Sequence, residues 1–161
     1  MNVFKNSASA NAAEPFVSVN CDFKASISNR VDFRSQNIQY FEDYTSDDIA
    51  LIARSYETGF NDSKKGMFLI FPKDIQSGSY KPSDENFPFK KFEYYENASN
   101  GNYTTSYTYE AQSGTVNVEV ISNDSKALRC LIQFDFKGKD NRTEELRVQG
   151  EAQINIFTRA L

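Results

Sequence analysis

Apolar and polar residues alternate along residues 114–156, and this pattern limits the fold of the chain more than any other feature of its sequence. In the segment 115–121, three valines alternate with polar residues. The segment 128–136 repeats the pattern with Leu131 as its one misfit, and the segment 146–156 repeats it again. A period of two over runs of this length is typical of β-strands with one buried and one solvated face. The sequence therefore predicts an all-β domain.

The composition excludes several classes of protein. The chain has 161 residues, a size typical of one domain, and its aromatic content of 14% favours pleated sheets. It contains no histidine, which excludes Ser-His-Asp and Cys-His catalysis and imidazole metal ligands. The net charge is −4 and there is no long basic tract, so we expect no nucleic-acid partner. No apolar run is long enough to predict a membrane-spanning segment.

Cysteine usage points away from a metal or a disulfide scaffold. Two cysteines, Cys21 and Cys130, are too few for a four-thiolate zinc site or a set of bridges. Cys130 falls on the apolar side of its segment and is interpreted as a small core residue. A Cys21–Cys130 disulfide is the alternative, because connectivity cannot be read from a sequence. We expect no metal and no cofactor.

The chain divides into a leader and one domain. Residues 1–15 are polar and rich in small residues, and we expect a flexible leader there. They lack the apolar core of a signal peptide, which favours the cytoplasm but leaves the compartment open. Residues 16–161 are expected to form a single β-sandwich domain.

Several further strands are predicted in the first half of the domain. Alternation predicts strands over residues 16–27 and from residue 31 to about residue 40. The segment 49–56 fits a helix as well as a strand, and we favour a strand because its neighbours are strands. The continuous apolar run 67–71 predicts a strand buried on both faces, and a short strand follows at residues 78–80.

Turn signals organise the second half. Asn100-Gly101 predicts a β-hairpin between the segments 89–96 and 102–111, because a type I′ turn requires positive φ at both central residues. Turn-forming residues then separate the later strands at 112–114, 123–126 and 138–141. Short connections imply a meander of about nine antiparallel strands. We predict an antiparallel β-sandwich, and the alternative is a lipocalin-like closed barrel with an interior pocket.

Three short motifs resemble a known group of domains. They are Ser-Gly-Thr-Val-Asn-Val at 113–118, Leu-Ile-Gln-Phe-Asp-Phe at 131–136 and Val-Gln-Gly-Glu-Ala-Gln-Ile at 148–154. These motifs resemble the C-terminal half of uncharacterised bacterial β-sandwich domains, many of them lipid-anchored. The resemblance implies a sandwich fold and a periplasmic or cell-surface setting, but no reaction and no catalytic residue. The chain departs from that group at Cys130, where a small residue is common, and in lacking a visible export signal.

Tyrosines form the first candidate ligand-binding surface. Tyr103, Tyr107 and Tyr109 share one face of a predicted strand, and Tyr94 and Tyr95 lie in its hairpin partner. Exposed tyrosine rings can stack on sugar rings while their hydroxyls form hydrogen bonds. The alternative is a cross-strand aromatic cluster that packs into the core.

Acidic residues offer weaker candidates. The loops rich in Asp and Asn lack the spacing of a calcium-binding EF-hand, and Asx turns explain them more simply. Glu119, Asp135 and Glu151 lie on the polar faces of their strands. We expect these carboxylates to pair with Arg129 and Arg147 rather than to act as a glycosidase pair.

These observations favour a non-enzymatic binding or protein-interaction domain with a protein or carbohydrate ligand. One alternative is a carbohydrate-binding module that uses the tyrosine face. Another is a carrier of a small apolar ligand inside a barrel. The sequence leaves the oligomeric state open.

Overall fold

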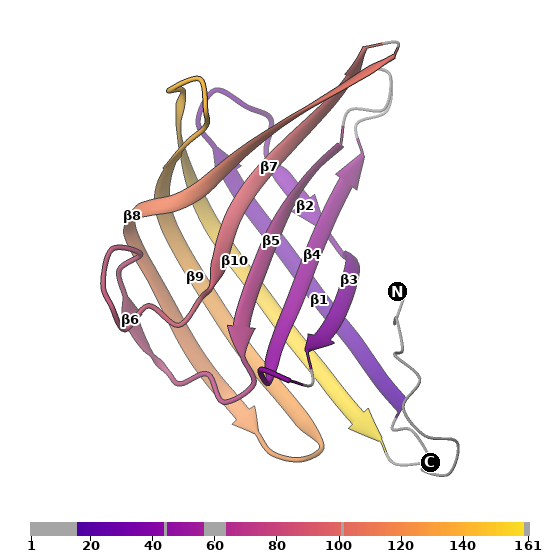
Figure 1. Cartoon of the computed structure of the whole chain (residues 1–161). Helices are drawn as coiled ribbons and strands as arrows, with labels where there is room; N and C mark the ends of the chain where they lie inside the picture. The colour runs from indigo at the N-terminus through magenta and orange to yellow at the C-terminus, as the bar shows by residue number, and fades with distance from the viewer. Residues whose placement is uncertain (1–15, 44, 57–63, 101, 160–161) are drawn as a thin grey trace.

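Ten antiparallel strands form one continuous sheet in the part of the chain that the structure describes (Figure 1). The computed structural model describes residues 16–43, 45–56, 64–100 and 102–159. Its strands are β1 (Phe16–Ile27), β2 (Phe33–Ser35), β3 (Asn37–Asp43), β4 (Asp48–Tyr56), β5 (Lys64–Pro72), β6 (Gly78–Tyr80), β7 (Lys91–Asn100), β8 (Tyr103–Asn123), β9 (Ala127–Lys139) and β10 (Glu145–Arg159). The strand order is β2-β1-β10-β9-β8-β7-β5-β4-β3, and β6 pairs with β8 outside this order.

The sheet curls into a nearly closed barrel, so the predicted β-sandwich is wrong. Alternation correctly predicts one buried face per strand, but the strands wrap around one core instead of splitting into two sheets. The predicted meander is confirmed from β3 to β10, apart from the short β6. The alternative of a closed barrel comes nearer to the structure, although the sheet stops short of closure between β2 and β3.

A β-bulge in β8 explains why one sheet replaces two. The predicted turn at residues 112–114 lies inside a continuous strand of 21 residues. The register with β9 shifts between Ala111 and Ser113, and Gly114 has φ of 109°. Figure 1 shows β8 crossing to the left-hand side and then bending downward. Since the strand bends without ending, its first half pairs with β7 and its second half with β6.

Two connections bring the ends of the sheet together. All 12 residues of β1 pair with β10, from Phe16 opposite Arg159 to Ile27 opposite Val148. At the other end of β1, the predicted strand 31–40 is split, because the chain passes from edge strand β2 to the opposite edge strand β3 through Gln36.

Ser35 links these two edges at the gap between β2 and β3, which is termed the seam. Its hydroxyl donates a hydrogen bond to the carbonyl oxygen of Arg54 at 2.5 Å and accepts one from the backbone N–H of Asn37 at 3.1 Å. Ser35 is buried, so these bonds are partly shielded from solvent. They join β2 to β3 and to β4 at the place where the barrel does not close.

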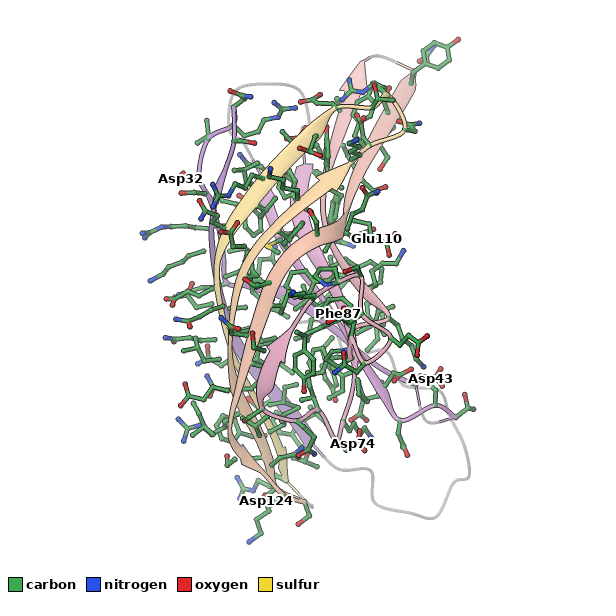
Figure 2. The ribbon with its side chains drawn as sticks, turned by 90° about the vertical axis from the view of Figure 1, so that its left-hand side faces the viewer. Asp32, Asp43, Asp74, Phe87, Glu110 and Asp124 are labelled. Carbon is green, nitrogen blue, oxygen red and sulfur yellow. The ribbon has the colours of Figure 1, made fainter. Side chains whose placement is uncertain are left out.

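Apolar side chains fill the interior of the barrel. Aromatic rings from several strands meet in edge-on and tilted contacts in a cluster of Phe71, Phe87, Phe89, Phe92, Phe134 and Phe136. Phe87 and Phe89 come from the loop between β6 and β7, and Figure 2 shows Phe87 on the inner side of the curved sheet. Buried rings of this size contribute a large part of the hydrophobic stabilisation of a core.

Three local predictions have clear outcomes. The strand at residues 49–56 is confirmed by β4. The hairpin is confirmed, but its predicted turn position is wrong: Asn100 is the last residue of β7 and lies opposite Tyr103, so it is not a central turn residue. Gly101 lies outside the described residues. The run 67–71 is a strand, but only one of its faces is in the core: Phe68 and Ile70 point outward and are half-buried.

The structure keeps the two cysteines apart. Cys21 and Cys130 both lie in the core, each opposite Ile154, so they are two strands apart. Adjacent strands are about 4.8 Å apart, so the two Cα atoms are too distant for the alternative disulfide, and both thiols are free. The leader predicted at residues 1–15 lies outside the described residues. In the described ranges we find no helix long and apolar enough to cross a membrane.

Candidate functional site

A cavity of about 680 Å³ opens at one end of the barrel, at the top of Figure 1, and is termed the mouth. The β1–β2 turn, the β9–β10 loop, the start of β5 and the β7–β8 hairpin converge there. The cavity is lined by Asn29, Arg30, Val31, Lys64, Lys65, Glu96, Asn97, Ala98, Tyr107, Arg142 and Glu144. The lining therefore combines segments that are far apart in the sequence.

Tight turns carry two arginines into the mouth. Asn29 has φ of 58° in the β1–β2 turn, and Thr143 has φ of 72° in the β9–β10 loop. Asp140 closes the second loop, because its Oδ1 accepts hydrogen bonds from the backbone N–H groups of Arg142 and Glu144, both at 2.9 Å. This is the Asx-turn role that the sequence predicts for the Asp- and Asn-rich loops.

Arg30 joins two walls of the mouth. Its Nε donates a hydrogen bond to Glu96 on β7, and one of its terminal nitrogens donates to Glu144 on the β9–β10 loop, both at 2.7 Å. Glu96 also accepts a hydrogen bond from the hydroxyl of Tyr94 at 2.8 Å. Burial disfavours the charge on Arg30, but the hydrogen bonds and charges of both carboxylates outweigh it and raise the pKa of Arg30.

Arg142 is held by a second network. Its guanidinium lies over the ring of Tyr107, with Cζ 3.5 Å from the ring centroid, in cation–π geometry. The same group donates to Asp140 at 2.6 Å, to Glu144 at 3.1 Å and to the hydroxyl of Tyr109 at 3.2 Å. Because Glu144 bonds both arginines, the two networks form one unit.

The surroundings shift the pKa values of two groups beneath the mouth. Burial alone would raise the pKa of Asp140, but hydrogen bonds from Arg142 and from backbone N–H groups lower it below its ordinary value. Burial raises the pKa of Tyr109, against the opposing hydrogen bond from Arg142. At neutral pH the site therefore holds an ionised Asp140 and a protonated Tyr109.

The mouth is locally positive in an acidic protein. Four cationic and two acidic side chains line the cavity, a net charge of +2, whereas the whole chain has a net charge of −4. The net charge of the mouth stays positive when Asp140, which binds Arg142, is included. Lys65 is buried, whereas Lys64 is exposed and makes no ion pair with a described residue.

The five predicted tyrosines do not share one exposed surface. Tyr94 and Tyr109 are 0% exposed and lie in the core, with their ring centroids 6.1 Å apart. Tyr107 is half-buried in the mouth, and Tyr95 lies on the outer face of the sheet, where its ring covers Gly66. Tyr103 is 79% exposed beside the hairpin turn. The alternative of aromatic packing therefore describes Tyr94 and Tyr109.

The predicted surface ion pair is present in part. Arg147 on β10 binds Asp135 on β9 through two hydrogen bonds, at 2.9 and 2.7 Å. Arg129 instead donates to Asn155 at 3.1 Å. Within the described ranges, no group of three or more acidic or cysteine side chains is arranged to hold a metal ion.

Two other hollows differ from the mouth in composition. One of about 470 Å³ lies over the polar outer face of β1, β10, β9 and β8, where charges of both signs balance closely. Another of about 350 Å³ lies at the opposite end of the barrel, near Asp124, which Figure 2 shows at the bottom. Neither combines an excess of positive charge with exposed apolar side chains.

Sequence reasoning did not identify the charged residues of the mouth. Arg30, Glu96, Arg142 and Glu144 stand in segments without a motif. The sequence carried only a local signal: Arg30 follows Asn29, and Arg142 follows the predicted turn at 138–141, so each arginine stands next to a turn-forming residue. Convergence of the two turns at one end of a barrel cannot be read from that signal.

Comparisons with protein-family models, with curated proteins and with solved structures give no match to this chain. The resemblance to lipid-anchored bacterial domains stays a prediction.

Proposed function

We propose that this chain is a non-enzymatic binding domain that holds a small organic anion with an apolar body at the mouth of its barrel. The observation that carries this proposal is a positively charged, partly apolar cavity on an otherwise acidic protein. A ligand of opposite charge is attracted to such a region, and field lines are focused in a concave site.

The size of the cavity fits a small molecule. Ligand sites commonly enclose about 300–1,000 Å³ and combine apolar walls with a few polar groups. The mouth has a volume of about 680 Å³, and Val31, Ala98 and Tyr107 contribute apolar surface to its lining. An apolar body of one or two rings would cover this surface.

Two cations remain able to bind an anionic group. Lys64 makes no ion pair with a described residue and is exposed. Arg142 is held by Asp140 and Glu144, yet its side chain is 46% exposed. Because the networks fix Arg142 and Arg30 in place, a ligand would meet a site that is already organised, which reduces the entropic cost of binding.

The two alternative functions have less support. A carbohydrate-binding platform needs several tyrosines on one exposed face, and Tyr94 and Tyr109 are buried. A carrier of an apolar ligand needs interior space, and side chains of the aromatic cluster fill the interior.

A matched pair of dyes tests the proposal. We expect 8-anilinonaphthalene-1-sulfonate to bind saturably with rising fluorescence, and N-phenyl-1-naphthylamine, which lacks the sulfonate, to bind more weakly. Added salt should weaken the binding of the sulfonate dye and leave the binding of the uncharged dye unchanged, because salt screens charge–charge attraction.

Charge reversal locates the site. Lys64→Glu should weaken sulfonate-dye binding about tenfold, equivalent to about 1.4 kcal/mol. Lys126→Glu makes the same charge change at an exposed position beside Asp124, at the opposite end of the barrel, and serves as the control. Equal losses in both variants, or no saturable binding by the wild type, would reject the mouth as the binding site.

A further inference from the structure

The β7–β8 hairpin extends beyond the rest of the sheet at the upper right of Figure 1. β5 pairs with β7 only as far as Asn97, and β9 pairs with β8 only from Glu110 onward. Glu110 is labelled in Figure 2 on the right of the molecule. Residues 103–109 of β8 therefore pair with β7 on one edge and with no described strand on the other. This second edge is termed the open edge.

The open edge lacks the features that normally prevent strands from pairing. Its sequence is Tyr-Thr-Thr-Ser-Tyr-Thr-Tyr, with no charged residue, proline or glycine. Natural edge strands are usually protected by lysines, prolines, bulges or short length. β-branched and aromatic residues also have high strand propensity. Five of the seven side chains are exposed, including Tyr103 at the far end.

We propose that the open edge pairs antiparallel with the open edge of a second copy of this chain, giving a two-fold symmetric dimer centred on Ser106. The proposal rests on the hairpin and does not depend on the ligand proposed for the mouth.

The length of the open edge sets the register. A strand that pairs along all of residues 103–109 with its own copy places Ser106 opposite Ser106. Beyond that window, the tip of one copy would meet the end of β9 in the other, because β9 occupies the edge from Glu110 onward. Both ends of the window are thus fixed by elements of the same chain.

The side chains suit self-pairing. In this register Thr104 faces Thr108 and Thr105 faces Tyr107 of the other copy, while Tyr109 stays buried in its own barrel. Threonine pairs directly opposite each other stabilise antiparallel strands, and no like charges meet. A charged partner strand would find no opposite charge within the window, which favours an uncharged partner such as the same segment.

The symmetry limits the assembly to two chains. Each copy uses its open edge once, and the same residues contribute on both sides, so the interface is isologous and closed. A seven-residue strand pair buries little area compared with permanent dimers, which places this contact among weak, concentration-dependent interactions.

Thiol cross-linking tests the register. Ser106→Cys should form a covalent dimer with a short bifunctional thiol reagent, because directly opposite residues have Cβ atoms about 5 Å apart. Asn117→Cys is exposed on the same strand, but its neighbours β6 and β9 occupy both edges, so it serves as the control. Cys21 and Cys130 are buried and their pKa values are raised to about 12, so they do not compete.

Molar mass tests the dimer itself. Sedimentation equilibrium of the wild type should show a mass that rises with concentration from 18.3 kDa towards twice that value. In a hairpin with Asn100 opposite Tyr103 across a two-residue turn, alternate N–H groups starting at Thr104 point to the open edge. Thr104→Pro should therefore keep the mass at that of one chain, while Thr104→Val should not.

Loss of dimerisation can be distinguished from loss of folding in these variants. Both Thr104 variants should retain the wild-type circular dichroism spectrum, since proline is tolerated on a strand edge whose N–H has no partner. A constant monomer mass for the wild type, with cross-linking no faster at Ser106→Cys than at Asn117→Cys, would overturn the proposal. Loss of dye binding at the mouth would leave it unaffected.

Discussion

Asp140 organises the mouth through a single buried carboxylate, whose side chain is 0% exposed. It holds the β9–β10 loop through two backbone N–H groups and orients Arg142. Its pKa is lowered by these hydrogen bonds. A carboxyl whose pKa is lower in the folded than in the unfolded state stabilises the fold above its unfolded pKa of about 3.9, and that contribution is lost as the pH falls through the folded value.

We therefore expect Asp140→Asn to lower the melting temperature at pH 7 and to flatten its dependence on pH between about pH 5 and pH 2. Thermal denaturation followed by circular dichroism across this range measures both effects. Asp84→Asn, at an exposed loop position, should follow the wild-type curve. Parallel curves for Asp140→Asn and the wild type would show that Asp140 is not the titrating group.

Gly114 shows how one residue decides the architecture. A Cβ at this position would lie 2.0 Å from the carbonyl oxygen of Asp135 and 2.8 Å from the Cα of Phe136. Its φ of 109° is also unfavourable for any residue with a side chain. The β-bulge in β8 therefore requires glycine.

Gly114→Ala should destabilise the protein by about 1–3 kcal/mol, because the new methyl group meets backbone that cannot move independently. Urea denaturation gives the value. Ser113→Ala, at the exposed neighbouring position, should stay within about 0.5 kcal/mol of the wild type. Equal stability of the two variants would mean that the bulge can relax.

The strands themselves were predictable, because each carries its pattern locally. β9 and β10 alternate along their whole lengths, and their buried residues fall where the sequence placed them. β8 was not predicted as one strand, because its Gln-Ser-Gly sequence is equally compatible with a turn and with a bulge. The choice between one sheet and two depends on which strand edges meet, and alternation contains no information about edges.

The connection between β2 and β3 depends on Ser35. Ser35→Ala removes the donor to the Arg54 carbonyl oxygen and the acceptor for the Asn37 N–H, so both hydrogen bonds are lost. We expect the free energy of unfolding to fall by about 1–3 kcal/mol, because each hydrogen bond contributes about 0.5–1.5 kcal/mol. In this variant, backbone amide hydrogen exchange should become faster in β3 and in the part of β4 that pairs with it, while exchange in β9 should change less.

A matched control is available for this substitution. Ser26→Ala removes an exposed hydroxyl that donates to Asp32 at 3.3 Å. Its stability and exchange pattern should match those of the wild type. If Ser35→Ala behaves in the same way, the seam is held by packing and not by these hydrogen bonds.

At the scale of the whole molecule, the mouth could not be predicted because it is built from distant segments. Arg30 bonds Glu96, 66 residues away, and Glu144, 114 residues away. The tyrosines were identifiable by type, but their burial depends on how the hairpin joins the barrel. Tyr109 therefore lies in the core and Tyr103 lies outside it, although both occupy the same face of one strand.

The two cysteines report on the integrity of the whole fold. Burial raises the pKa of both thiols to about 12, so neither forms appreciable thiolate at pH 8 in the native protein. We expect no reaction with Ellman's reagent before unfolding and two reactive thiols in urea. Rapid labelling of either residue in the native state would contradict the packing of β1, β9 and β10 described above.

The pairing of β1 with β10 has a consequence for biosynthesis. A ribosome releases β1 first, yet the strand that covers its full length is encoded about 130 codons later, from Val148 to Arg159. During translation the nascent β1 has only the short β2 as a sheet neighbour. The barrel therefore cannot close until β10 has been synthesised, and a ribosome that stalls before β10 leaves this edge of β1 unpaired and accessible to chaperones.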